Sequence, residues 1–263
     1  MPIPKALASV GVALACATAA VSVGDVRGAA AADERPNVVV LYVDDVSPKT
    51  PWLWGKSERT PNLARFRQKG VEFRHAVGST PLCGPSRATL LTGKYSHNHG
   101  VIGNGLRSFD PSRTLATKLR GAGYHTILAG KYGNGIEEAA PTRKAVRKYA
   151  RGWDDFDIIW KRPTKGKGQF YDYKLWTRDG VEWKGSAAKD HSTYVVGKRI
   201  ARHIREAPAS EPVFALASLN SGHDPNTPLR WHRGAATCRG VANYKAPSFN
   251  ERDVSDKPAY IRS

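Results

Sequence analysis

An unbroken apolar run that ends in two aspartates is the feature that most constrains the fold of this chain. Residues 37–43 (NVVVLYV) are apolar and rich in β-branched side chains, which predicts a strand buried on both faces of a parallel sheet. Further strands are predicted at 124–129 (YHTILA) and at 212–218 (PVFALAS). Because helical patterns alternate with these strands, the sequence predicts an α/β fold with a mostly parallel or mixed sheet flanked by helices.

Capping residues and glycines mark the predicted helices. A helix at 60–70 starts with a Thr-Pro pair and stops at a glycine, and a second at 85–93 runs from proline to glycine. A third at 114–123 ends at one of two glycines. The pattern at 192–207 predicts a longer amphipathic helix capped by Ser192.

Other local signals are a hairpin, a short strand and two basic tracts. The dipeptide Asp179-Gly180 stands between aromatic-rich arms, which predicts a β-hairpin. A short strand is predicted at 71–77 (VEFRHAV). The basic tracts at 143–151 and 161–167 are typical of loops or surface helices.

The first 32 residues have the pattern of a cleaved secretory signal. Lys5 precedes an apolar stretch rich in Ala and Val, and small residues follow it. A membrane anchor is the alternative, but the stretch is short and Ala-rich for a span of about 20 strongly apolar residues. The folded part is therefore expected at 35–263, in a secreted or extracytoplasmic protein without stable membrane insertion.

The charge of the chain indicates what kind of partner it attracts. The 263 residues carry a net charge of +18, and removing the signal takes away Lys5, Asp25 and Arg27, so 18 − 1 leaves +17. Such a surface attracts polyanions, either nucleic acid or a sulfated or uronic polysaccharide, and charge alone does not choose between them. After the signal only Cys83 and Cys238 remain, too few for a disulfide scaffold.

Polar side chains gather where predicted strands end and a predicted helix begins. Asp44 and Asp45 follow the first strand, Cys83 precedes the second helix, and Lys131 and His223 follow later strands. At one edge of a sheet, the carboxylates would suit Ca²⁺ or Mg²⁺, and Arg87 with Lys131 would suit an anionic ester. Each residue also has an ordinary alternative: the aspartates as a turn or cap, the cysteine as a small buried hydrophobe, the histidine as a surface residue.

The segment "CGPSRATLLTG" resembles the signature of type I sulfatases, Cys-x-Pro-Ser-Arg followed by Leu-Thr-Gly. Three further segments, "RPNVVVLYVDD", "LAGKY" and "SGHDP", resemble that family's aspartate, lysine and histidine motifs, in family order, over about 35–263. The combination "LTGKYSHNHGV" and "AGKYGNG" is most similar to N-acetylglucosamine-6-sulfatases and related heparan-directed sulfatases.

The resemblance implies a fold, a modification and a set of roles. The fold would be alkaline-phosphatase-like, and a separate maturation enzyme would oxidise Cys83 to formylglycine. Arg87 would hold that residue, while Lys131 and His223 would bind the sulfate and the leaving oxygen. A divalent metal, usually calcium, would be bound by the modified residue together with two carboxylates, those of Asp44 and Asp45. The hydrated aldehyde would attack sulfur, and its second hydroxyl would later expel sulfate.

The implied substrate is a sulfated sugar, 6-sulfated N-acetylglucosamine in glycosaminoglycan-type chains, with no nucleic-acid partner. One position in the lysine motif differs from that of many arylsulfatases. Many arylsulfatases have Lys-x-His in the lysine motif, where this chain has Gly133; His97 or His99 could compensate or be ordinary loop residues.

The family's later Asp-Asn metal pair and a further lysine have no match in the sequence. The chain is therefore expected to be an incomplete N-terminal catalytic domain, truncated at its C-terminus and inactive alone. One alternative is an inactive remnant that binds polyanionic glycans. Another, a related phosphodiesterase or phosphomonoesterase, is disfavoured because those enzymes use Thr or Ser where this chain has Cys83.

Overall fold

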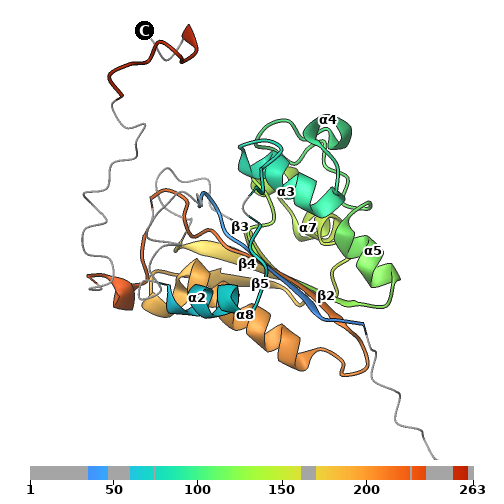
Figure 1. Ribbon diagram of the computed structural model, residues 1–263. Coiled ribbons are helices and arrows are strands. Elements are labelled where there is room, and N and C mark those ends of the chain that lie inside the picture. Colours follow the sequence, from blue (N-terminus) through green and yellow to red (C-terminus); the bar gives the residue numbers. More distant parts are fainter. Residues whose placement is uncertain are drawn as a thin grey trace, which may run out of the picture. The chain divides into compact units, whose positions relative to one another are not determined.

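The described residues form one mixed β-sheet of six strands (Figure 1). The computed structural model describes residues 35–46, 60–73, 75–160, 170–225, 227–234 and 251–259, all within one unit, Ala32–Ser263. The strands are β1 (Val38–Tyr42), β2 (His125–Gly130), β3 (Asp155–Trp160), β4 (Tyr173–Thr177), β5 (Val181–Lys184) and β6 (Val213–Ser218). Their order is β1-β6-β2-β3-β4-β5, parallel from β1 to β3 and antiparallel across β3-β4 and β4-β5.

Helices connect and cover these strands. They are α2 (Pro61–Gln68), α3 (Cys83–Thr92), α4 (Ser96–His99), α5 (Leu115–Gly121), α6 (Ile136–Ala139), α7 (Arg143–Tyr149) and α8 (Ser192–Glu206), with 3-10 turns η1 (Ala188–Asp190) and η2 (Arg230–His232). The predicted hairpin is confirmed as β4-β5, and the basic tract at 143–151 forms the surface helix α7. Among the described residues, no helix combines the length and the apolar character that crossing a bilayer requires.

Side chains alternate between two cores along the central strands. On one face, Leu128 and Phe214 pack with residues of α3, α5 and α7, and on the other, Ile127 and Ala215 pack with Val196 of α8. Figure 1 shows α8 on the opposite side of the sheet from α3, α5 and α7. The unbroken apolar run of β6 is therefore explained, because both faces of this central strand are covered.

The edge strand β1 is less buried than its sequence predicts. Val39 and Leu41 are 50% and 61% exposed. They pair in register with Ala215 and Ala217 and so lie on the α8 face, but α8 packs mainly on β2 and β6. The prediction that 37–43 is buried on both faces was wrong for this reason, whereas the strand itself is confirmed.

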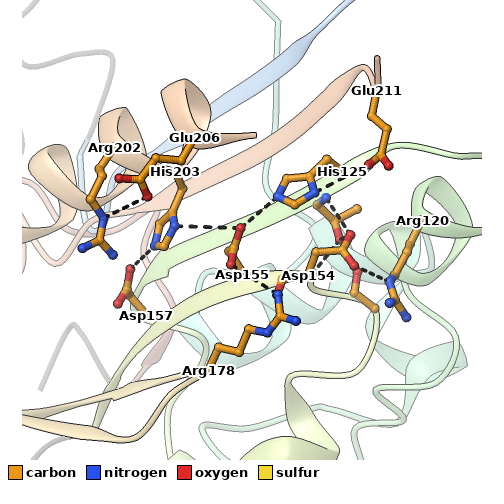
Figure 2. A network of polar contacts seen from close by, with 12 residues as sticks. Arg120, His125, Asp154, Asp155, Asp157, Arg178, Arg202, His203, Glu206 and Glu211 are labelled. Atoms are coloured by element: carbon orange, nitrogen blue, oxygen red, sulfur yellow. Dashed lines mark hydrogen bonds and ion pairs between the residues drawn. The ribbon is translucent and has the colours of Figure 1, made fainter. Parts of the chain in front are cut away.

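Strand β3 was not predicted, because two aspartates interrupt its apolar pattern. Asp157 is 1% exposed, and its carboxylate accepts a 2.6 Å hydrogen bond from His203 Nε2 and lies 3.6 Å from Arg199. Asp155 lies 2.8 Å from His125 Nε2 and 3.9 Å from His203 Nδ1, as Figure 2 shows. These contacts tie β2, β3 and α8 together at the start of the parallel strands.

Three local predictions differ from the structure. The described residues of 71–77 form no strand, and their large apolar side chains are exposed. Helix α3 begins at Cys83, two residues before the predicted start. Helix α8 begins at Ser192 itself, because the preceding His191 is the cap and its Nδ1 accepts from the Thr193 N–H. The predicted signal at 1–32, the tract at 161–167 and Cys238 lie outside the described residues.

Candidate active site

The carboxyl ends of β1, β6 and β2 bring the candidate residues to one edge of the sheet. Asp44 follows β1, His223 follows β6 and Lys131 directly follows β2. The backbone N–H of Asp44 donates to Ser221 O at 3.1 Å, and that of Lys131 donates to Ser218 O at 2.8 Å. Because parallel strands end at the same edge, main-chain pairing alone holds these three segments side by side.

A buried ion pair lies at the centre of this edge. Lys131 Nζ is 2.5 Å from Asp44 Oδ2, and Arg87 Nη2 is 3.4 Å from Asp44 Oδ1. All three residues are at most 4% exposed. Burial opposes ionisation of Asp44, but Arg87 and Lys131 outweigh it and hold the pKa of that carboxyl below its usual value. The Asp44 carboxylate is therefore ionised, and the positive charges of Arg87 and Lys131 balance its negative charge.

Arg87 joins helix α3 to the sheet. Its Nη1 donates to Lys131 O at 2.9 Å and to Ser218 Oγ, and its guanidinium lies 5.1 Å from the centre of the Tyr42 ring. Its Nε is buried and has no hydrogen-bond partner among the described residues. Arg87 lies one helical turn after Cys83, so the two side chains start from the same side of the helix.

Cys83 is the first residue of α3 and is partly buried. Its Sγ lies 3.9 Å from Asp45 Oδ1. Burial raises the pKa of the thiol; Lys131 acts in the opposite direction, and the neighbouring Asp44 and Asp45 carboxylates raise the pKa further. A thiol in this environment stays protonated, which is unlike the thiolates of cysteine-dependent enzymes.

The remaining two residues complete the cluster at its exposed side. Asp45 has a half-exposed side chain, and its Oδ2 lies 3.8 Å from His223 Nε2. His223 Nδ1 donates to the carbonyl of Asp224 at 2.7 Å, so Nε2 faces the cluster. Ligating atoms of Asp44, Cys83 and His223 all lie within 4.8 Å of one another. The expected convergence of these segments is thus observed.

Some residues of the site carried no sequence signal. Ser218 and Tyr42 are the last residues of β6 and β1, and they contact Arg87 from two strands. Ser86 shares a 2.5 Å hydrogen bond with Tyr42 Oη. Asn104 accepts a hydrogen bond from the residue after Cys83. For Ser218 and Tyr42, their place at the end of a strand was the one available signal of a role in the site. Nothing in the sequence indicated such a role for Ser86 or Asn104.

His97 and His99, which could compensate for the histidine missing at position 133, have contacts of their own. Both ring nitrogens of His99 are engaged, with Thr89 Oγ1 at 3.1 Å and with the Val101 N–H at 3.1 Å. His97 stacks on Tyr95. The space beside Gly133 is filled, because a Cβ there would lie 2.9 Å from Leu106.

The sulfatase family model matches residues 36–255. The chain belongs to the sulfatase family. N-acetylglucosamine-6-sulfatase of Capra hircus is 31% identical over 221 residues, which cover 80% of this chain and 38% of that protein. The N-acetylglucosamine-6-sulfatase of Homo sapiens is 31% identical over 213 residues, covering 77% and 37%. The chain thus spans about two fifths of the length of these relatives.

Solved structures agree with the fold. The chain of a structure described as a complex with its substrate, D-glucosamine-2-N,6-O-disulfate, aligns with a TM-score of 0.63 and 23% identity, over 82% of this sulfatase and 40% of that chain. The α/β architecture is therefore alkaline-phosphatase-like, as expected from the resemblance.

Proposed function

We propose that this sulfatase hydrolyses sulfate esters of sugars, with 6-sulfated N-acetylglucosamine in glycosaminoglycan-type chains as the substrate. The observation that carries the proposal is the position of Cys83 at the start of α3, 3.9 Å from Asp45 and beside the buried Asp44–Lys131 pair. The names of the goat and human relatives support the substrate. The strong positive charge of the chain also suits a polyanionic glycan.

Formylglycine at position 83 gives this arrangement a chemical rationale. A protonated thiol flanked by carboxylates is a poor nucleophile, whereas a hydrated aldehyde supplies two hydroxyls on one carbon, one to attack sulfur and one to drive release of sulfate. The unused Nε of Arg87 is available to hold an oxygen of the modified residue. A maturation enzyme that oxidises the cysteine is therefore a proposed partner.

The donor atoms fit a divalent cation better after the modification than before it. Carboxylate, thiol and imidazole together would suit zinc. Replacing the thiol with oxygen leaves Asp44, Asp45 and residue 83 as oxygen donors, which suit calcium. A bound calcium ion would orient the sulfate oxygens and stabilise negative charge at the nucleophile. Calcium takes 6–8 ligands, more than these three residues supply. The prediction of a calcium site therefore includes further ligands of the kind that the family's later Asp-Asn pair provides.

The other side chains have roles that follow from their positions. Lys131 lies at the buried end of the cluster, where its ammonium would offset negative charge on the sulfate oxygens. His223 presents Nε2 at the exposed side and would donate a proton to the leaving sugar oxygen when it is protonated. Arg87 would keep residue 83 and Lys131 in fixed relation through its contacts with both sides of the site.

Export is proposed on the pattern of the first 32 residues alone. Cells expressing the chain with a C-terminal tag should release a form that lacks these residues, which N-terminal sequencing would identify. A retained protein that keeps them would contradict export.

A second candidate function is binding of polyanionic glycans without catalysis. It is favoured by the charge of +18. The two functions differ in what they require of the site. Catalysis needs residue 83 and recognises the 6-sulfate, whereas polyanion binding needs neither.

The test uses protein co-expressed with a formylglycine-generating enzyme and supplied with calcium. The sulfatase proposal predicts tighter binding of 6-sulfated than of unsulfated N-acetylglucosamine, lost in Lys131→Met. It also predicts Cys83-dependent sulfate release once the metal site is complete, so release is measured with this chain and with any longer chain that contains it. Equal binding of both sugars, or release that persists in Cys83→Ala, would contradict it.

A further inference from the structure

The loop that follows α4 returns to the first turn of α3. Residues 100–106 form the first part of the connection between α4 and α5. The loop is fixed at one end by Val101, whose N–H donates to His99 Nδ1. At the other end Leu106 is 2% exposed and packs on Gly133, and its carbonyl accepts from Tyr149 Oη. The middle of the loop is thereby held against the start of α3.

Asn104, in the middle of this loop, caps α3. Its Oδ1 accepts a 2.9 Å hydrogen bond from the N–H of Gly84, the residue directly after Cys83. Gly84 allows the approach, because a Cβ there would lie 2.9 Å from Gly103 O and 3.2 Å from Asn104 Oδ1. The side chain thus contacts the peptide unit that joins residues 83 and 84.

Helix α3 depends on this contact because its own cap supplies none. Leu82 occupies the cap position and has no side-chain hydrogen bond to the first turn. Pro85 has no N–H, and the N–H of Ser86 already donates to Leu82 O at 3.0 Å. The buried N–H of Gly84 would otherwise be an unsatisfied donor in the first turn.

We propose that Asn104 is a positioning residue for the nucleophile at position 83. By fixing the peptide unit between residues 83 and 84, it sets the direction of the side chain at 83 toward Asp45. Through Leu106 and Gly133 the same loop fixes the segment that follows Lys131, so nucleophile and lysine are held in register. The catalytic consequence rests on the proposed function, whereas the positioning itself does not.

The experiment compares Asn104→Ala with Asn104→Asp, which keeps an acceptor, and with Asn98→Ala, an exposed asparagine nearby as the matched control. Two readouts need no sulfatase activity: hydrogen exchange at the Gly84 amide, and the rate at which iodoacetamide alkylates Cys83 in the unmodified chain. Loss of a helix cap predicts that both become about five- to tenfold faster in Asn104→Ala. Wild-type exchange at the Gly84 amide is expected in Asn104→Asp, and wild-type rates at both probes are expected in Asn98→Ala.

In matured, active protein Asn104→Ala is expected to lower kcat by about ten- to a hundredfold with little change in KM. The kcat of Asn104→Asp should be close to that of the wild type. A wild type without turnover would refute the proposed function, while exchange and alkylation would still decide the positioning role. A Gly84 amide that exchanges freely in the wild type, or unchanged rates at both probes in Asn104→Ala, would overturn the proposal. The wild-type exchange measurement decides even if the alanine variant does not fold.

Discussion

Replacing Gly130 with alanine should damage both the sheet and the site. Gly130 is the last residue of β2, with a φ of +115°, in a region that side-chain-bearing residues rarely adopt. An added Cβ would lie 1.9 Å from the carbonyl oxygen of Ser218, the same oxygen that accepts from the Lys131 N–H. Because the obstacle is backbone on a central strand, no side-chain rotation relieves the contact.

Two terms set the size of the effect. A non-glycine residue in a sparsely populated backbone region costs about 1–3 kcal/mol. Overpacking a well-packed interior costs about 1–3 kcal/mol more. Together they predict that Gly130→Ala lowers the free energy of unfolding by about 4 kcal/mol. For a chain of this size that corresponds to a melting temperature lower by about 8–16 °C.

The matched control is Gly197→Ala. Gly197 is exposed in the middle of α8, and an added Cβ would meet no atom within 4 Å. Alanine there should stabilise the protein by about 0.5–1 kcal/mol, because it favours the helix over the unfolded chain. Thermal and urea unfolding of both variants test the reasoning. A Gly130→Ala protein that melts within about 2 °C of the wild type would refute the close approach of β2 and β6.

Two further predictions concern the polar contacts at the opposite edge of the sheet, shown in Figure 2. Asp157→Ala should destabilise the fold by about 3 kcal/mol in urea unfolding, because it removes the nearer of the two carboxylates beside buried His203, the one 2.6 Å from Nε2. Lys198→Ala, on the exposed face of the same helix, should change nothing measurable. Burial opposes ionisation of Asp154, but hydrogen bonds from Thr126 and Arg120 outweigh it and lower its pKa. The contribution of ionised Asp154 to the stability of the fold is therefore complete above the unfolded-state pKa of about 3.9. It is lost as the pH falls through the lower pKa of the folded state. Melting curves should show that the wild type melts at a higher temperature than Asp154→Asn, and that this difference disappears only in that acid range. A difference in melting temperature that is the same at every pH would contradict the lowered pKa of Asp154.

How far the sequence could predict the fold depended on burial. Strand β6 was predictable because both of its faces are covered, which leaves an unbroken apolar run. The β4-β5 hairpin was predictable from its Asp-Gly turn. Strand β3 was not, because buried Asp157 is stabilised by His203 and Arg199 from another element, and no local pattern reveals such a partner.

The candidate site was predictable where its residues end strands or begin a helix. Asp44 and Lys131 occupy such positions, and the topology of parallel strands brought them together. The part played by Ser218 in anchoring Arg87 depends on a contact between segments far apart in the chain. The cap that Asn104 provides depends on how the loop after α4 folds back onto α3. The sequence also did not predict what occupies the space beside Gly133, because Leu106 fills it from another loop.

The chemical state of residue 83 tests the central claim most directly. The chain is co-expressed with a formylglycine-generating enzyme whose activity is verified on a second sulfatase, and the peptide that contains residue 83 is analysed by mass spectrometry and by hydrazide labelling. The account predicts an aldehyde at position 83 in the folded protein, and none in Cys83→Ala. Only unmodified thiol at position 83, under conditions in which the second sulfatase is fully converted, would contradict it.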